Sequence, residues 1–220
     1  MSILLENHSL KKNIIMKTQT KDIQTKITPM AALQLLVEGN ERFTKNSEWD
    51  RNLLTQVKET SSGQYPFAVV LSCIDSRVPA EKVFDQGIGD IFSIRIAGNF
   101  INDDILGSME FACKVAGSKL IVVLGHSSCG AVKGACDNVE LGNLTAMLSK
   151  IKPAVDAIEE SGDRSSANPT FVQKVSDKNV ELAIEQIKAR STVLNEMLES
   201  KQIEIVGGMY SVETGSVTFN

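Results

Sequence analysis

The sequence predicts a single α/β domain with a central, mostly parallel β-sheet flanked by helices. Three short apolar runs, at 67–72, 90–96 and 119–124, are rich in β-branched residues. Runs of this kind are typical of strands buried on both faces, as in a parallel sheet. A helical pattern over 103–115 separates the second run from the third, as in a βαβ unit. With 220 residues, 42% of them hydrophobic, the chain can bury one substantial core.

The rest of the chain supplies flanking helices and an edge hairpin. Residues 1–26 are polar and rich in Lys, Thr and Gln, so we expect a flexible N-terminal arm and a single folded domain over 27–220. Thr28 and Pro29 open a predicted amphipathic helix through Phe43. The remaining expectations are an irregular or partly helical segment at 46–65, a helix at 141–160 that contains Pro153, a loop at 161–168, a long helix at 169–200, and strands at 203–210 and 216–219 that form a C-terminal strand pair or hairpin.

Charge and hydropathy exclude two classes of function. A net charge of −4 and a pI near 5.3 argue against a nucleic-acid-binding surface, which needs clustered Lys and Arg. No run reaches the ~18 apolar residues of a membrane span, and the first 26 residues lack a signal-peptide core. We therefore expect a cytoplasmic protein with no membrane partner. Met16 is an alternative start to Met1.

Three metal-binding side chains follow two of the predicted strands. Cys73 comes directly after the first apolar run, whereas His126 and Cys129 follow the third. The other histidine, His8, lies in the arm. Reactive groups gather at the carboxyl ends of parallel strands, and two cysteines with one histidine form a known catalytic zinc set. Spacing alone leaves a second interpretation open, in which these are ordinary buried side chains.

Two short motifs extend this set. Cys73-x-Asp75-x-Arg77 is followed by His126-x-x-Cys129-Gly130. In this order, and at these strand ends, the pair resembles the signature of the β-class carbonic anhydrases. The resemblance extends from about residue 64 to residue 134 and is weaker outside this range.

The resemblance implies an activity and a set of roles. It implies reversible hydration of carbon dioxide to bicarbonate and a proton, by attack of a zinc-bound hydroxide, in a single catalytic zinc domain over 27–220. Cys73, His126 and Cys129 would hold one Zn²⁺ per subunit, with Asp75 and Arg77 as the catalytic dyad. Physically, a bidentate pair with Arg77 would keep Asp75 ionised, so that it can accept a hydrogen bond from the hydroxide and aim an oxygen lone pair at the carbon of carbon dioxide.

Four further residues match positions of the family that contact substrate. They are Gln64, Phe92, Phe111 and Gly130. Phe111 stands where many members have Tyr, which removes a hydroxyl. In the family the residues at the Gln64 and Phe111 positions come from a neighbouring subunit. The resemblance therefore implies a homo-oligomer, dimer or tetramer, with its active site near the subunit interface.

One subgroup of the family has a bicarbonate inhibition site formed by Trp, Arg and Tyr. Here Arg95 is present, but Val70 stands at the Trp position. We therefore expect no such site, and water as the fourth zinc ligand, with Asp75 a ligand only in a closed form. Cys113 lies within the apolar pattern of a predicted helix, so we expect it to be buried in the core. We assign no role to Cys113 or to Cys136.

Several alternatives share parts of this pattern. Enzymes with related folds hydrolyse carbon disulfide or carbonyl sulfide at the same ligand set, and the sequence does not distinguish them. A non-catalytic zinc or nucleotide-binding domain is a different class, but no phosphate-loop motif is present. A Cys–His protease is disfavoured because its nucleophile and base usually come from separate segments. A structural zinc site would need a fourth ligand, for which Asp75 is the one nearby candidate.

Overall fold

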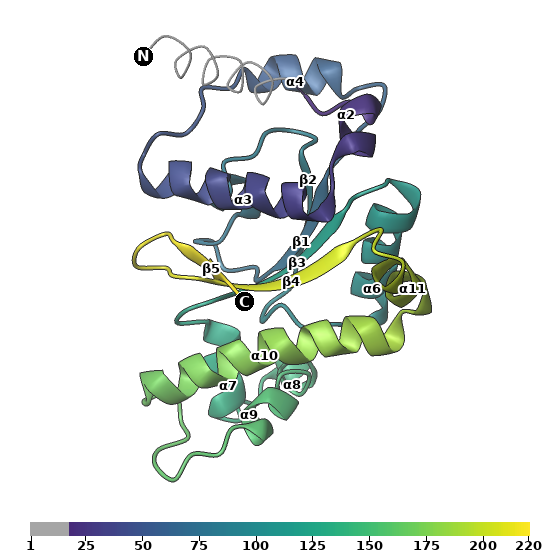
Figure 1. Cartoon of the computed structure of the whole chain (residues 1–220). Coiled ribbons are helices and arrows are strands. Elements are labelled where there is room, and N and C mark those ends of the chain that lie inside the picture. Colours follow the sequence, from purple (N-terminus) through teal and green to yellow (C-terminus); the bar gives the residue numbers. More distant parts are fainter. Residues whose placement is uncertain (1–17) are drawn as a thin grey trace.

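The computed structural model describes residues 18–220, and the predicted arm residues 1–17 lie outside the described residues (Figure 1). The strands are β1 Ala68–Ser72, β2 Ile91–Arg95, β3 Leu120–His126, β4 Glu204–Tyr210 and β5 Val217–Phe219. The helices are α2 Lys21–Lys26, α3 Pro29–Thr44, α4 Leu53–Glu59, α5 Ala80–Val83, α6 Asp103–Glu110, the π-helix η1 Phe111–Val115, α7 Gly130–Cys136, α8 Gly142–Leu148, α9 Lys152–Ala157, α10 Pro169–Arg190 and α11 Thr192–Glu199.

The five strands form one sheet in the order β2-β1-β3-β4-β5. The first four strands are parallel, and β5 runs antiparallel to β4, which confirms the predicted parallel sheet and C-terminal hairpin. In the register of β1 and β3, Ser72 stands opposite Leu124. The segments that follow these two strands therefore leave the sheet at the same edge, and the metal-binding side chains lie on those segments.

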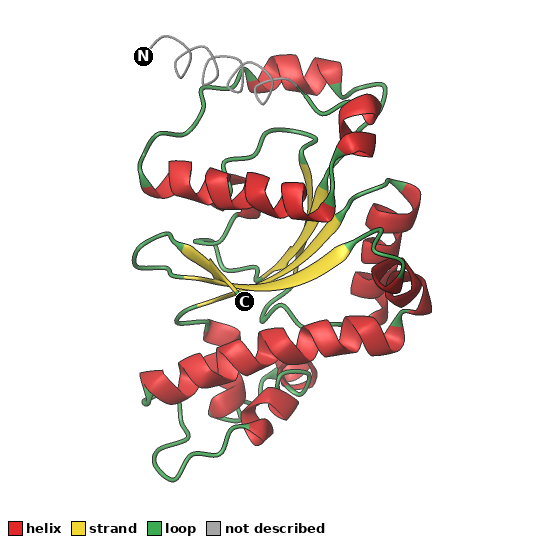
Figure 2. Ribbon diagram, viewed as in Figure 1, coloured by secondary structure: helices red, strands yellow, loops and turns green. Residues whose placement is uncertain are grey.

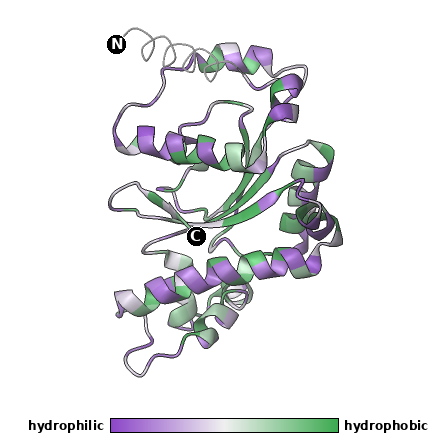
Figure 3. Ribbon diagram, viewed as in Figure 1, coloured by the Kyte–Doolittle hydropathy of each residue, from purple (hydrophilic) through white to green (hydrophobic). Residues whose placement is uncertain are grey.

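Helices cover both faces of the sheet (Figure 2). Alternate residues of each central strand point to opposite faces because the side-chain period of a strand is two. One set packs with α6, η1, α10 and α11, and the other packs against α3 and α5. Every residue of β1 and β3 is buried, and both strands are predominantly apolar (Figure 3). This burial explains why both read as continuous apolar runs in the sequence.

Helix α3 begins as its sequence predicts. The Thr28 side chain accepts a hydrogen bond from the Ala31 N–H at 3.2 Å, and Pro29 occupies the first turn. A proline is tolerated there because the first N–H groups of a helix have no intrahelical partner. The predicted helix at 103–115 is also present, as α6 followed by the π-helix η1.

Two predicted helices are each broken in two. The segment 141–160 forms α8 and α9, with Pro153 in the first turn of α9, because a proline inside a helix would remove a hydrogen bond and clash with the preceding turn. The segment 169–200 forms α10 and α11, divided at Ser191. The Ser191 hydroxyl accepts from the Leu194 N–H and donates to Glu110. A capping serine thus starts a new helix at a position where the apolar periodicity alone predicts that α10 continues.

The folded chain begins before residue 27. Helix α2 lies within the segment assigned to the arm, and its Gln24 is buried. The Gln24 amide donates to the carbonyl oxygens of Pro66 and Ala116, both at 2.8 Å. These bonds hold α2 against the amino-terminal end of β1 and the end of η1.

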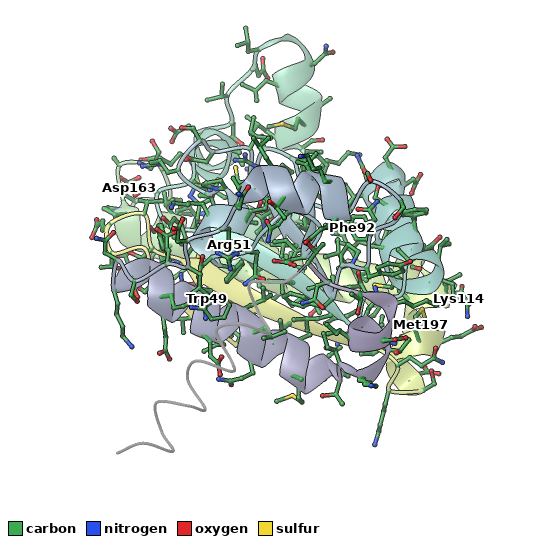
Figure 4. All side chains as sticks on the ribbon, turned by 90° about the horizontal axis from the view of Figure 1, so that it is seen from above. Trp49, Arg51, Phe92, Lys114, Asp163 and Met197 are labelled. Atoms are coloured by element: carbon green, nitrogen blue, oxygen red, sulfur yellow. The ribbon has the colours of Figure 1, made fainter. Side chains whose placement is uncertain are left out.

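A buried ion-pair cluster joins α3 to the segment before α4. Asp85 binds the guanidinium groups of Arg42 and Arg51, and the Arg42 guanidinium lies 3.7 Å from the ring centroid of Trp49. Figure 4 shows Trp49 and Arg51 close together on this side of the molecule. The Asp85 side chain is only 2% exposed, and both of its carboxylate oxygens face these guanidinium groups.

Removing that carboxylate should destabilise the fold. We expect Asp85→Ala to lower the free energy of unfolding by about 3–5 kcal/mol, because it leaves two guanidinium groups buried without a counter-ion. Urea unfolding of the variant measures this loss. Asp103→Ala is the matched control, since Asp103 pairs with Arg190 but its side chain is 95% exposed, and we expect a change below about 1 kcal/mol. Equal losses in the two variants would contradict the prediction.

Among the described residues, no helix combines the length and the apolar character needed to cross a membrane.

Candidate metal centre

The fold places three buried donor side chains together at the carboxyl edge of the sheet. Cys73 directly follows β1, His126 ends β3, and Cys129 is the N-cap residue of α7. The two Sγ atoms lie 3.9 Å apart, and the donor atoms of all three residues lie within 4.8 Å of one another. This spacing leaves room for one ion between them. The convergence follows from the direct pairing of β1 with β3 in parallel register.

The orientation of His126 leaves one ring nitrogen free for a metal. Its Nδ1 lies 2.9 Å from the Ser127 carbonyl oxygen, to which a protonated Nδ1 donates. That hydrogen bond fixes the tautomer in which Nε2 carries the lone pair. Nε2 is buried and has no hydrogen-bond partner. A buried nitrogen that has no hydrogen-bond partner and lies beside two thiols is what a metal-binding set requires, so these three residues fit a metal ion.

The two thiols share their protons unequally. The pKa of Cys73 is lowered because its sulfur accepts hydrogen bonds, chiefly from the Cys129 thiol and also from the Gly98 N–H. The pKa of Cys129 is raised because it keeps the shared proton and because it is buried. The N–H groups of Val132 and Ala131, in the first turn of α7, donate hydrogen bonds to the Cys129 sulfur and by themselves lower its pKa. A bound cation would replace the shared proton and favour both thiolates.

Asp75 and Arg77 form a bidentate pair beside this centre. Arg77 donates from Nε to Oδ1 at 2.9 Å and from Nη2 to Oδ2 at 2.8 Å, and its backbone N–H also donates to Oδ1 at 2.9 Å. These hydrogen bonds hold the pKa of Asp75 well below its usual range. Asp75 is therefore an ionised acceptor with a fixed orientation at neutral pH.

Arg95 holds the backbone of the same segment. From the end of β2 it donates to the carbonyl oxygen of Cys73 at 3.0 Å and to that of Asp75 at 2.6 Å. One guanidinium thus spans the residue that supplies a thiol and the residue that supplies the carboxylate. The sequence pattern offered no signal for this contact, because a single Arg at a strand end has many uses.

The structure does not bring the four predicted substrate-contact residues together around the three donors. Gly130 does adjoin the centre, as the first residue of α7. Gln64 is exposed and precedes β1, so the whole strand, about 16 Å long at ~3.3 Å per residue, separates it from Cys73. Phe92 and Phe111 pack edge to face with centroids 6.1 Å apart. Phe92 pairs with Val69 near the start of the sheet, away from the carboxyl edge.

Two further cysteines are buried and lie outside the donor cluster. Burial raises the pKa of Cys113 to about 12, in agreement with its predicted core position. Cys136 lies at the end of α7 in the apolar cluster beneath the centre, and its pKa is also raised by burial. Neither thiol has the properties of a reactive nucleophile.

Comparison with known proteins places this architecture in a family. The family model described as carbonic anhydrase matches residues 68–217. Carbonic anhydrase 2 of Mycobacterium tuberculosis is 36% identical over 191 residues, which is 85% of this chain and 90% of that protein.

Solved structures share the fold. The β-carbonic anhydrase CafA of Aspergillus fumigatus superposes with a TM-score of 0.67 at 23% identity, covering 87% of this chain and 89% of that chain. A structure from a report on two tetrameric β-carbonic anhydrases of Sordaria macrospora gives a TM-score of 0.63 at 24% identity, covering 74% and 84%. By its sequence, its fold and its matched relatives, the chain belongs to the β-carbonic anhydrase family of enzymes.

Proposed function

We propose that the protein catalyses the reversible hydration of carbon dioxide to bicarbonate and a proton, with one Zn²⁺ per subunit held by Cys73, His126 and Cys129. One observation carries the proposal: the orphaned Nε2 of His126 and two buried thiols lie within 4.8 Å of one another, next to a carboxylate fixed by Arg77. Membership of the carbonic anhydrase family supports the same activity.

The donor set suits zinc. Thiolate and imidazole ligands are those that Zn²⁺ prefers, and three protein ligands leave the open position of a catalytic site. When bound, zinc acts as a Lewis acid that lowers the pKa of water and so supplies a nucleophile near neutral pH. All four cysteines of the described residues are free, as the proposed reducing cytoplasmic setting requires.

Asp75 orients the reacting water. Its carboxylate is ionised and held on two oxygens, so it can only accept hydrogen bonds. A water molecule that donates its hydrogen to Asp75 turns a lone pair away from the carboxylate, toward the carbon of carbon dioxide. Arg77 keeps the carboxylate in place, and Arg95 holds the backbone on which both depend.

The charges of the centre predict the pH dependence of activity. Two thiolates cancel the two positive charges of zinc, so the reacting water should be less acidic than at a site of three neutral histidines. We expect kcat to rise between about pH 7 and about pH 9. Asp75 does not cause this rise, because its lowered pKa keeps it ionised throughout that range. Stopped-flow hydration assays at constant ionic strength measure the profile, and a rate that stays flat from about pH 6 to about pH 9 would contradict this account.

A second copy of the chain completes the site in this proposal. Gln64, Phe92 and Phe111 lie far from the donors of their own chain, whereas Phe111 is 51% exposed and neighbours Val115, which is 72% exposed. An exposed apolar face of this kind suits burial against a partner. The tetrameric state of the Sordaria relatives supports an assembly of copies, dimer or tetramer.

Charging that face should separate the subunits. We expect Phe111→Lys to lower both the sedimentation coefficient and kcat while one zinc per chain is retained, because the lysine would have to be buried without a partner. Leu141→Lys is the matched control, since Leu141 is 68% exposed at the N-cap of α8, away from η1 in the sequence. A variant that dissociates but keeps full activity would refute the shared site.

The activity itself is tested by following carbon dioxide hydration with a pH indicator in a stopped-flow instrument, with zinc content determined on the same sample. Zinc-loaded protein that shows no hydration at about pH 8.5 would overturn the proposal. Carbon disulfide and carbonyl sulfide would then be assayed as substrates of the same centre.

A further inference from the structure

One buried amide lies in the middle of α10, on the face that packs into the core. Asn179 is only 5% exposed and lies between Val175 and Val180, which belong to the hydrophobic core. Asn is a weaker helix former than Ala, and burial of an amide costs free energy unless it is hydrogen-bonded. Helix formation and packing alone would favour an apolar residue here, so the amide indicates a specific contact.

The Asn179 amide contacts the loop beside the metal centre. Its Nδ2 donates to the Gly98 carbonyl oxygen at 2.8 Å. The Gly98 N–H in turn donates to the Sγ of Cys73 at 3.3 Å. Asn179 and Cys73 are therefore linked through the two polar groups of one glycine, and both hydrogen bonds are buried.

The conformation of Gly98 leaves little freedom for this loop. Its φ is +80°, and a Cβ at this position would lie 2.4 Å from the Cδ1 of Ile151. The next residue, Asn99, also has a positive φ, and its N–H donates to the Ile96 carbonyl at 2.9 Å. The peptide before Gly98 aims an N–H at sulfur, and the peptide after it is held by Asn179. Rotation of either peptide would disturb the other.

We propose that Asn179 is a positioning residue of the metal centre, which holds Gly98 so that its N–H donates to the Cys73 thiolate. An N–H···S hydrogen bond draws electron density from a thiolate and so tunes its bond to a metal. The inference rests on the proposed zinc site and adds to it a contact from a helix that supplies no ligand.

The test compares three variants with the wild-type protein, each prepared with Co²⁺ as a spectroscopic probe and, in a separate sample, with zinc for the release measurement. Asn179→Leu keeps a similar volume but has no donor. Asn179→Asp keeps the shape but places a carboxylate against the Gly98 carbonyl. Ser176→Ala is the matched control, because Ser176 is equally buried on α10 but its hydroxyl donates to Val172 within the helix, at 2.9 Å. Thermal melting of each variant shows that it is folded.

We expect both Asn179 variants to shift the thiolate-to-cobalt charge-transfer band to longer wavelength, since a thiolate without its hydrogen bond is more easily oxidised. We also expect them to release zinc to a chelator about tenfold faster, the lower end of the usual effect of second ligand-sphere changes. Ser176→Ala should match the wild type in both measurements.

Two results would refute a positioning role. An unchanged band and release rate in Asn179→Leu would leave Asn179 as a packing contact alone. Equal changes in Ser176→Ala would point to a general loosening of α10. If wild-type protein takes up neither cobalt nor zinc, the proposed metal site fails as well, and the wild-type sample identifies that failure before any variant is considered.

Discussion

Cys129→Ser is expected to abolish zinc binding and carbon dioxide hydration together. A serine hydroxyl is neutral at this pH and is a poor ligand for zinc, so only Cys73 and His126 would remain. Two protein ligands would hold the ion far more weakly than three. Zinc content after dialysis against a weak chelator and the stopped-flow hydration rate should therefore fall in parallel, with kcat reduced by at least about 10³-fold.

The control for this variant lies on the same helix. Cys136→Ser makes the same chemical change at the other end of α7, at a residue that is also buried but lies outside the donor cluster. We expect full zinc content and nearly unchanged hydration, with some loss of stability. A zinc-free Cys136→Ser protein would show that the substitution acts on the fold rather than on the ligand set.

Asp75→Asn should separate catalysis from metal binding. The amide keeps the size of the carboxylate but carries no charge. Its NH₂ group would face an Arg77 nitrogen that in the wild-type protein donates to a carboxylate oxygen, so two donors would meet. The variant should retain one zinc per chain, because Asp75 lies outside the three-donor cluster. We expect kcat to fall by about 10²–10⁴-fold, the usual contribution of a positioned proton acceptor.

Asp163→Asn is the control for the loss of a carboxylate. Asp163 accepts a hydrogen bond from the Ser165 N–H at 2.8 Å in a surface loop, so its neutralisation should leave hydration unchanged. Parallel loss of zinc and activity in Asp75→Asn would make Asp75 a ligand in the resting protein and would contradict its proposed role.

The sequence predicts the sheet and the donor cluster for a shared physical reason. β1 and β3 are buried on both faces, so their composition must be continuously apolar, and such runs are visible without a structure. The donors come directly after these runs, where the topology of a parallel sheet collects them. The predicted order of elements placed Cys73 and Cys129 at the same edge of the sheet, and the direct pairing of β1 with β3 brings them together although their sequence separation is large.

Features that depend on single hydrogen bonds could not be predicted in this way. Helix α10 ends at Ser191 through a cap that competes with an uninterrupted apolar pattern, and sequence periodicity cannot decide between them. The link from Asn179 to Gly98 joins residues whose proximity depends on how α10 crosses the end of the sheet.

The unpartnered Nε2 of His126 has a consequence for the thermodynamics of the protein. A buried polar atom without a partner costs about 1–3 kcal/mol, and in the metal-free protein this cost is part of the free energy of folding. A bound ion removes the cost and binds the folded chain in preference to the unfolded one. Metal supply would then set the amount of folded protein as well as its catalytic rate, so that scarcity of the ion lowers abundance and activity through the same three side chains.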